Sequence, residues 1–324
     1  MPPLNARWIV PMAWVYRSTW RTSDKSITAT PISITTNRSH GMQLAVYGTL
    51  RKGLHNHALL GNSRYVGKVL LQGELYDLGG VPALRKGRAP VVAECYDIDD
   101  TTLKAVDRLE GFDENNPDGS LYTRERVVAQ KLNNGKPIET SVYFFNSAGR
   151  GIKRIHEVCY RDYLARQAAF SASGARSGRQ WIVCFGSNMS SSRLSARVGR
   201  LKAGIPGVIR DHDLAFNKRA LNSDEVYANL LESSSGATLG VAYSLTLEQV
   251  TTLDSYEGYP RHYLRTVIEF SPHDSNEDQT VSAYIAHPDK VGDGTPSPQY
   301  LKHIDAGWNE YWGIPFPEHL LKRK

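Results

Sequence analysis

Two glutamates lie in the same short acidic pattern, one in each half of the chain. The pattern Asp-x-x-Glu-Gly occurs as DRLEG at residues 107–111 and as DSYEG at residues 254–258. In each copy, Glu110 or Glu257 follows a helical turn with apolar residues and precedes a glycine and an aromatic residue. Such surroundings can desolvate a carboxyl group and raise its pKa toward neutral pH, where it can exchange protons. A single glutamate at a helix end is more often a surface residue, but the repetition favours a functional pair.

A glycine-containing tripeptide precedes each of these glutamates. It reads YGT at residues 47–49 and FGS at residues 185–187, each at the end of a short apolar run. Glycine lets the backbone approach a ligand closely, and successive N–H groups in such a turn can bind an anion or a carbonyl oxygen. The alternative is a glycine that merely turns the chain after a strand. We predict two ligand loops, formed by Tyr47, Gly48, Thr49 and Leu50 in the first half and by Gly186, Ser187 and Asn188 in the second.

Tyr122 and Tyr263 follow the glutamates and are weaker candidates for ligand binding. Their spacing from the glutamates differs, because the first half carries an extra ENNPDGS segment. Strand tyrosines that pack on a core would give the same pattern. The ten histidines have no metal-like grouping, and no P-loop or Gly-x-Gly-x-x-Gly sequence occurs in a suitable context. We therefore predict neither a metal nor a cofactor.

Each glutamate lies at the end of a predicted helix that strands surround. The first helix is expected at residues 99–109, with Asp99 or Asp100 as its cap and Gly111 at its end, and the second at residues 247–256. Two further helices are expected, one from residue 152 to about residue 169 and one from about Ser297. Strands are expected at residues 44–47, 66–76, 91–98, 122–129, 140–145, 181–185, 208–216, 227–230, 238–244, 263–270 and 280–286. Because strands outnumber helices and seldom alternate with them, we predict an α+β protein with two tandem mixed-sheet β-barrel domains and peripheral helices.

The repeat also indicates how the chain is divided into domains. Residues 95–111 align without gaps with residues 242–258, and a repeat of about 140 residues corresponds to a domain. The segment FSASGARSGRQ has the composition of a flexible connector. We predict a first domain at 42–169, a linker at 170–180 and a second domain at 181–324. Residues 1–41 are expected to be a flexible N-terminal extension ahead of Met42, with an organelle transit peptide as the alternative.

Composition indicates which broad classes of protein this sequence does not fit. The 324 residues carry a formal net charge of +6 and three cysteines. No apolar run approaches the roughly 20 residues of a membrane-spanning helix. The odd cysteine count favours reduced thiols in the cytoplasm over a secreted disulfide framework. The basic segments are not interleaved with stacking aromatic residues, so we expect no nucleic-acid partner and no membrane partner.

The ordered motifs resemble a known family, and the resemblance covers nearly everything after residue 42. YGTLRKGLHNHALL, GELYDLGGVPAL and VDRLEGF in the first half resemble the AIG2-like branch of the γ-glutamyl cyclotransferases. FGSNMSSSRL, LDSYEGY, the tyrosine and arginine at residues 263 and 265, and PSPQYLKHIDAG in the second half resemble γ-glutamyl cyclotransferase itself. Several ordered motifs in each half make coincidence a poor explanation.

The resemblance implies a small-molecule γ-glutamyl substrate and a cyclising acyl transfer. The α-amine would attack the γ-carbonyl of its own molecule, giving 5-oxoproline and releasing an amine or amino acid. Glu110 and Glu257 would accept and return the proton, because an α-ammonium is not nucleophilic and an amide nitrogen leaves poorly until it is protonated. Phe185 departs from the family, which usually has the tyrosine that the first half retains as Tyr47. The second site is therefore expected to be slower, altered in specificity or only a binding site.

Alternatives from other functional classes stay open. One is a small-molecule binding or regulatory pair in which one or both sites are inactive, although both glutamates are retained. The other is a nucleic-acid-associated protein, which would rest on charge alone and would bind in a salt-sensitive way. The released amine and the oligomeric state are not determined by these patterns. The polar linker favours halves that move independently.

Overall fold

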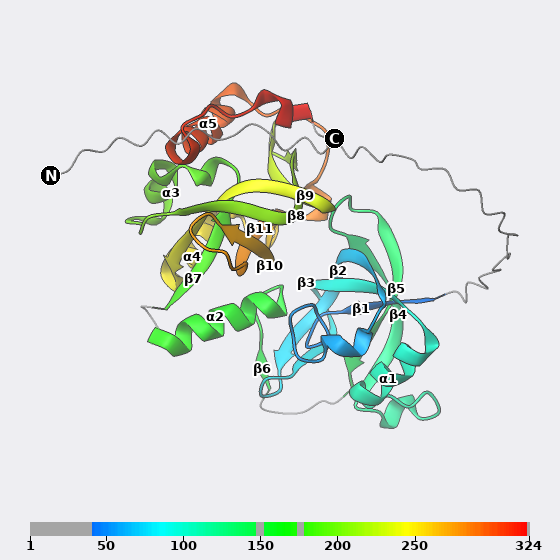
Figure 1. The fold of residues 1–324 in the computed structure, drawn as a ribbon. Helices are drawn as coiled ribbons and strands as arrows, with labels where there is room; N and C mark the ends of the chain where they lie inside the picture. Colours follow the sequence, from blue (N-terminus) through cyan, green and yellow to red (C-terminus); the bar gives the residue numbers. More distant parts are fainter. Residues whose placement is uncertain (1–40, 147–151, 174–177, 323–324) are drawn as a thin grey trace, which may run out of the picture. The chain divides into compact units, whose positions relative to one another are not determined.

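Two strand-rich halves follow one another along the chain, each with its own closed barrel (Figure 1). The computed structural model describes residues 41–146, 152–173 and 178–322. The predicted N-terminal extension, residues 1–41, lies outside these ranges except for Gly41. Residue contacts place both halves in a single unit, residues 39–324.

The first half builds a barrel from five strands. Its elements are β1 (Met42–Val46), β2 (Arg64–Asp77), β3 (Pro82–Ile98), α1 (Asp100–Glu110), β4 (Tyr122–Lys131), β5 (Pro137–Phe145), β6 (Lys153–Arg154) and α2 (Tyr160–Ser173). The sheet order is β3-β1-β5-β4-β2-β6, and a further pairing of β2 with β3 closes the ring. Strand β1 runs antiparallel to β3 and parallel to β5, so the sheet is mixed.

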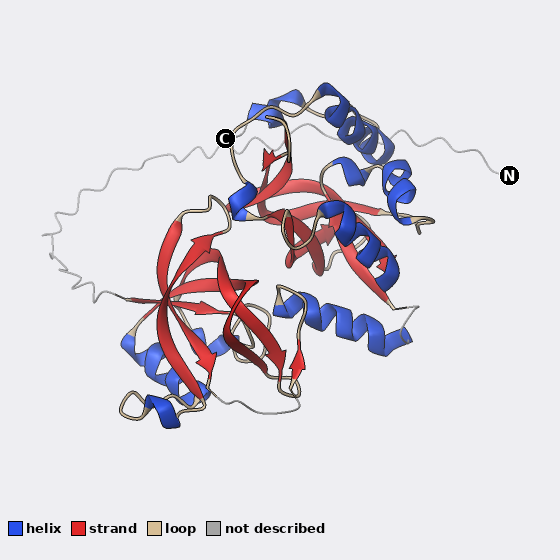
Figure 2. Ribbon diagram, turned by 180° about the vertical axis from the view of Figure 1, so that it is seen from behind, coloured by secondary structure: helices blue, strands red, loops and turns tan. Residues whose placement is uncertain are grey.

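The second half repeats this plan. Its elements are β7 (Arg179–Cys184), α3 (Ser191–Val198), β8 (Ile205–Arg219), β9 (Val226–Thr246), α4 (Leu247–Glu257), β10 (Tyr263–Pro272), β11 (Gln279–Ala286) and α5 (Pro298–Trp312). The strands close in the order β10-β11-β7-β9-β8, with β7 antiparallel to β9 and parallel to β11. Figure 2 shows the helices around the strands. The prediction of two mixed barrels with peripheral helices is confirmed.

The ends of the two glutamate-bearing helices are encoded locally. Asp99 caps α1 by accepting a hydrogen bond from the Thr102 N–H at 2.7 Å, and Thr246 forms a capping box with Gln249 at the start of α4. Gly111 and Gly258 end the helices in the left-handed conformation, both with φ of 62°. Glycine adopts this conformation without the steric cost that a Cβ would bring. Each glutamate is therefore the last helical residue, directly before a sharp change of chain direction.

Several predicted elements differ from the observed ones. Residues 227–230 and 238–244 belong to one continuous strand, β9, because β8 pairs with residues 226–232 and 237–242 of it, on either side of a register shift. Strand β3 begins at Pro82, directly after the Gly79–Gly80 turn, where the prediction placed its start at residue 91. Helix α3 was not predicted, since it is only 8 residues long and contains few apolar residues.

The helix expected at residues 152–169 begins later and ends later. Lys153 and Arg154 instead form an edge strand on β2, and α2 starts only at Tyr160. Helix α2 extends through residues 170–173 and β7 begins at Arg179, so regular secondary structure occupies both ends of the predicted linker at 170–180. The predicted helix was assigned to the first half, yet α2 packs on β7, β10 and α4 of the second.

The two halves share part of their buried core. Leu70, Val92 and Val158 of the first half belong to the same buried cluster as the apolar interior of the second barrel. Burial of apolar surface is the main favourable contribution to such an association. The expectation of independent halves, which rested on the polar composition of the linker, did not anticipate this contact.

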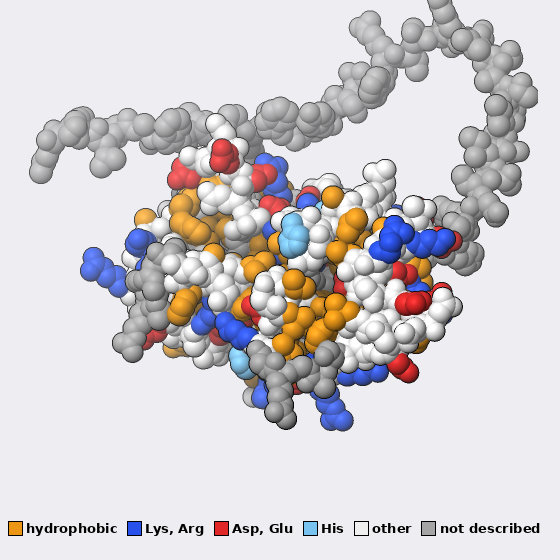
Figure 3. Space-filling view, turned by 90° about the horizontal axis from the view of Figure 1, so that it is seen from below, with side chains coloured by type: hydrophobic (Ala, Val, Ile, Leu, Met, Phe, Trp, Pro, Cys, Tyr) orange, Lys and Arg blue, Asp and Glu red, His pale blue; other side chains and the backbone are white. Residues whose placement is uncertain are grey.

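Basic side chains are dispersed on the face of the molecule shown in Figure 3. Neutral and acidic side chains lie between the Lys and Arg side chains on this face. Among the described residues, no helix combines the length and the apolar character needed to cross a lipid bilayer.

Candidate active sites

The predicted residues of the first half come together around one pocket of about 350 Å³. It lies between the turn after β1, the start of β3, the end of α1 and the start of β4. Every residue predicted for this site lines the pocket: Tyr47, Gly48, Thr49, Leu50, Glu110 and Tyr122. Segments that lie far apart in sequence therefore form a single site.

Glu110 is the only acidic side chain among the residues that line the first pocket. Burial raises its pKa from 4.5 to about 7, and no hydrogen bond or ion pair of its carboxylate is found among the described residues. Without such a partner, the charged form of Glu110 depends on a ligand in the pocket for its stabilisation. Near neutral pH, such a carboxyl group can both take up and release a proton.

Glycine at position 48 is required by close packing. A Cβ at Gly48 would lie 2.4 Å from Cγ of Pro82, at the start of β3. The neighbouring Tyr47 hydroxyl donates to the backbone carbonyl of Tyr143 at 3.0 Å and accepts from the Leu84 N–H at 3.3 Å. The hydroxyl of Tyr47 thus holds β3 and β5 together, so its absence in Phe185 removes a structural hydrogen bond.

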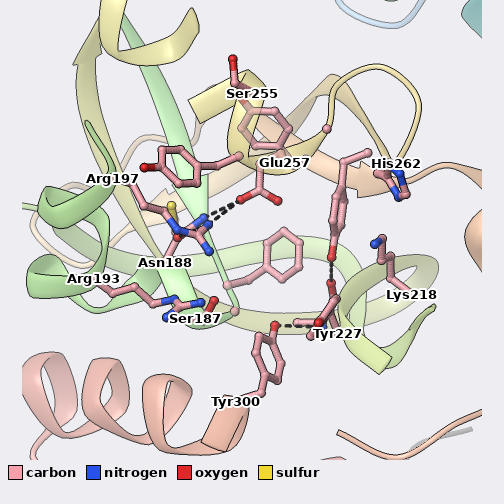
Figure 4. A pocket seen from close by; sticks show the side chains of 18 of the residues that line it. Ser187, Asn188, Arg193, Arg197, Lys218, Tyr227, Ser255, Glu257, His262 and Tyr300 are labelled. Carbon is pink, nitrogen blue, oxygen red and sulfur yellow. Dashed lines mark hydrogen bonds and ion pairs between the residues drawn. The ribbon is translucent and has the colours of Figure 1, made fainter. Parts of the chain in front are cut away.

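The predicted residues of the second half surround a pocket of about 470 Å³ (Figure 4). Gly186, Ser187, Asn188, Glu257 and Tyr263 all line it. A Cβ at Gly186 would lie 2.9 Å from Cβ of Ala228, so this turn also needs a glycine. The two halves therefore place their glycine turn and their glutamate at corresponding positions.

Glu257 differs from Glu110 because its carboxylate has partners. Asn188 Nδ2 donates to Glu257 Oε1 at 2.8 Å, and Arg197 Nη1 donates to the same oxygen at 3.1 Å. Arg197 also donates to Asn188 Oδ1 at 3.0 Å, which closes a triangle of contacts. Burial raises the pKa of Glu257, while Arg197, Asn188 and Lys218 act in the opposite direction.

Two further cations line the second pocket. Lys218 on β8 is only 5 % exposed, and its ammonium lies 5.3 Å from the ring centroids of both Tyr227 and Tyr263. Arg193 on α3 has a buried Nε that finds no hydrogen-bond partner within the described part of the chain. Burial lowers the pKa of both groups. Figure 4 shows Arg193 and Arg197 on one side of the pocket and Lys218 on the other, with Glu257 between them.

These cations and one tyrosine were missed by sequence reasoning. Arg193 and Arg197 are four residues apart, a spacing that places both on one helix face, but α3 itself was not predicted. Lys218 gives no sequence signal in its strand. Tyr300 comes from α5, and its hydroxyl accepts a hydrogen bond from the Ala228 N–H at 3.0 Å, while Tyr263 donates to the Ala228 carbonyl at 3.1 Å.

The aspartate of the acidic pattern has a structural partner in each half. In the first half, Arg124 donates from Nη1 to both carboxylate oxygens of Asp107, at 2.8 and 2.6 Å. Tyr143, which faces Arg124 across β4 and β5, donates its hydroxyl to Asp107 at 2.6 Å. The guanidinium also lies 4.9 Å from the ring centroid of Phe112. We call these four residues the first clamp.

The second half repeats this arrangement residue by residue. Arg265 donates from Nη1 to Asp254, and Tyr284, its partner across β10 and β11, donates to the same carboxylate at 2.6 Å. The Arg265 guanidinium lies 4.8 Å from the ring centroid of Tyr259. We call these four residues the second clamp. In each half the clamp holds the chain on both sides of the Glu-Gly pair, which explains why aspartate and an aromatic residue flank it.

Comparison with known proteins agrees with this repeated geometry. The family described as gamma-glutamyl cyclotransferase, AIG2-like, matches residues 44–164 and again residues 182–308. The chain therefore belongs to this family and carries its domain twice. The family assignment inferred from the motifs is confirmed.

Two relatives in sequence match one domain's length or less, and one solved structure matches both halves. A provisionally named gamma-glutamylcyclotransferase of Methanocaldococcus jannaschii is 38% identical over 105 residues, which are 31% of this chain and 81% of that protein. A Niallia circulans protein, named gamma-L-glutamyl-butirosin B gamma-glutamyl cyclotransferase, is 38% identical over 71 residues, 21% of this chain and 46% of that protein. The crystal structure of YkqA from Bacillus subtilis has the same fold over both halves, with a TM-score of 0.67 and 18% identity across 86% of this chain and 95% of that one.

Proposed function

We propose that this protein is a γ-glutamyl cyclotransferase with two active sites. In each site the α-amine of a γ-glutamyl compound attacks its own γ-carbonyl carbon. The new C–N bond closes the 5-oxoproline ring, the original amide C–N bond breaks, and the amine or amino acid leaves. The observation that carries the proposal is a partly buried carboxyl group with a raised pKa that lines a pocket beside a glycine turn, present in both barrels.

Glu110 and Glu257 are proposed to move the proton. The carboxylate takes a proton from the α-ammonium, which makes the amine nucleophilic, and later gives it to the departing nitrogen. A pKa of about 7 suits both halves of this exchange at Glu110. Nucleophile and electrophile belong to one molecule, so a pocket that holds the substrate folded supplies much of the remaining rate enhancement.

The two glycine turns are proposed to bind the reacting end of the substrate. Close packing at Gly48 and Gly186 brings the backbone to the pocket wall. Backbone N–H groups in such turns can stabilise the negative charge that develops on the γ-carbonyl oxygen. Tyr122 and Tyr263 line the same pockets, and we propose that their rings shape the walls while their hydroxyls bond to the backbone carbonyls of Pro82 and Ala228.

We further propose that the two sites differ in the charge of the leaving group. The second pocket contains three cations, Arg193, Arg197 and Lys218, against the single carboxylate of Glu257. Buried cations without a counter-charge are costly, and an anionic ligand removes that cost. The first pocket contains no Lys or Arg among its lining residues. The second site should therefore favour γ-glutamyl compounds with an acidic leaving group, and the first should favour a neutral one.

Mass-spectrometric detection of 5-oxoproline tests the function. The full chain is incubated with γ-glutamyl-glutamate and with a γ-glutamyl-alkylamine, and the same assay is run on Glu110→Gln, on Glu257→Gln and on the double variant. We expect each single substitution to lower turnover of one substrate by about a hundredfold or more. Absence of product from every substrate would favour the binding-module alternative, and full activity of the double variant would disprove the roles given to the glutamates.

The three cysteines are free and buried. Such thiols suit a reducing compartment, and we propose a cytoplasmic location for the protein.

A further inference from the structure

The second clamp includes a contact that the first clamp lacks. Arg265 donates from Nε to Asp162 at 2.8 Å, and the exposed fractions of the two side chains are 1 % and 0 %. Asp162 belongs to α2, the last element before the chain enters the second barrel. We propose that Asp162 is a positioning residue for the second active site, so that this site reaches its working geometry only with the end of the first half in place. The proposal rests on the proposed function of the second site.

The carboxylate of Asp162 is held in a complete polar environment. Besides Arg265, it accepts hydrogen bonds from Gln180 Nε2 and from Ser282 Oγ, both at 2.7 Å. Gln180 lies on β7 and Ser282 on β11, so the donors come from three different strands of the second barrel. A buried carboxylate is stable only when its partners satisfy it in this way. Asp162 therefore has one defined position, and Arg265 is fixed relative to it.

A short series of contacts joins Asp162 to Glu257. Arg265 uses Nε for Asp162 and Nη1 for Asp254, which lies one helical turn before Glu257 on α4. On the other side of Glu257, the hydroxyl of Tyr259 accepts a hydrogen bond from the Val158 N–H at 2.9 Å. Residues 158–162 of the first half thus contact the support of Glu257 on both of its flanks. A displacement of about 1 Å at a reacting group is enough to lower a rate substantially.

The first site has no corresponding support from the second half among the described residues. Arg124 reaches a second carboxylate, Glu114, but at 3.6 Å, and the Glu114 side chain is 83 % exposed. Exposed ion pairs contribute little to the position of either group. The dependence is therefore expected in one direction only: the second site needs the first half, whereas the clamp of the first site is complete within its own half.

The substitution Asp162→Asn tests this dependence with little change in shape. It keeps an oxygen for Gln180 and Ser282 but removes the charge that holds Arg265. The first site inside the same molecule serves as the internal control. Asp162→Asn is combined with Glu110→Gln, which leaves only the second site, and separately with Glu257→Gln, which leaves only the first. We expect kcat of the second site to fall at least tenfold with KM changed less than twofold, and both constants of the first site to stay within twofold.

A second measurement does not depend on turnover. Hydrogen exchange, followed by mass spectrometry, compares the peptide that contains α4 with the peptide that contains α1. Asp162→Asn should increase exchange at the end of α4 and leave α1 unchanged. Glu157→Gln is the matched control, because Glu157 lies on the same segment and pairs with Arg166 at 3.4 Å, away from Arg265. This control should change neither peptide.

The outcomes separate the two proposals. An unchanged second site, or an equal loss at both sites, would overturn the positioning role. If the second site shows no turnover even in the wild-type chain, the proposed function fails there, and exchange at α4 alone then decides the positioning role. If Asp162→Asn does not fold, Tyr259→Phe replaces it, because this variant cuts the contact with Val158 without leaving a buried charge. Selective loss at the second site then supports the proposal, and an unaffected second site overturns it.

Discussion

The two sites keep the same framework and differ in the charge around the glutamate. Both have a glutamate at a helix end, a left-handed glycine after it and an arginine clamp beside it. Glu110 has no cation in its pocket, whereas Glu257 lies among Arg193, Arg197 and Lys218. The comparison teaches that the parts that place the carboxyl group are retained in both copies. The residues that line the rest of each pocket differ.

The largest difference between the two halves is expected in how much the clamp arginine contributes to the stability of the fold. Arg265→Met leaves Asp162 buried without a counter-charge, and we expect a loss of about 3–5 kcal/mol. Arg124→Met leaves Asp107, whose side chain is 20 % exposed, and water can replace part of the lost contact, so we expect about 1–2 kcal/mol. Denaturant unfolding of the two variants measures both values. Equal losses would show that the buried pair with Asp162 adds nothing to the second clamp.

Because the Glu110 carboxylate has no partner among the described residues, we expect its replacement to stabilise the folded protein in a pH-dependent way. Its pKa of about 7 in the folded protein exceeds the ordinary 4.5, so the folded state holds this proton more tightly than the unfolded chain does. Wild-type stability should therefore fall as the pH rises from about 4.5 to about 7, by up to about 3 kcal/mol. Glu110→Gln lacks this titrating group and does not lose this stability. The variant should therefore be as stable as the wild type near pH 4, and its extra stability should be largest near pH 8.

Thermal unfolding across this pH range checks the prediction, with Glu257→Gln as the matched control. Glu257 is paired with Arg197, so its replacement leaves a cation without its partner and should give no comparable gain. A similar stabilisation in both variants would contradict the difference drawn between the two carboxyl groups.

The charge difference between the pockets predicts a change in selectivity. Lys218→Met removes a cation from the second pocket while keeping the length of the side chain. We expect kcat/KM for γ-glutamyl-glutamate to fall about tenfold and that for a neutral γ-glutamyl-alkylamine to change little, since a charged hydrogen bond contributes roughly 1.5–3 kcal/mol. Kinetics in the Glu110→Gln background isolate the second site. A uniform loss for both substrates would mean that Lys218 does not select charge.

The smallest effect is expected where the two glycine turns differ. Tyr47→Phe gives the first half the phenylalanine that the second half has at Phe185. It removes hydrogen bonds to the backbone of Tyr143 and Leu84, so we expect a loss of stability of about 1–2 kcal/mol. Turnover by the first site should stay within a few-fold of the wild type, measured by 5-oxoproline release. A loss of a hundredfold would place the hydroxyl in the reaction.

Local patterns were sufficient for the parts of the fold that depend on near neighbours. Asp99 and Gly111 gave the ends of α1 to within one residue, because caps use residues only a few positions apart. The start of α2 was wrong, because residues 153–154 take part in a strand pairing with β2 that lies far away in the sequence. Pairing with a distant strand overrides local propensity.

The repetition of motifs within one chain determined the family, the two barrels and the pair of glutamates. It worked because each pattern encodes a local geometry, a helix end beside a glycine, that any copy of the fold must contain. Only the tertiary structure decided which side chains surround each glutamate. Lys218 and Tyr300 reach the second site from a strand and a helix, and Asp162 of the other half pairs with Arg265 of the second clamp. Burial and distance set the charge and the support of each site, and neither is encoded in the spacing of residues along a sequence.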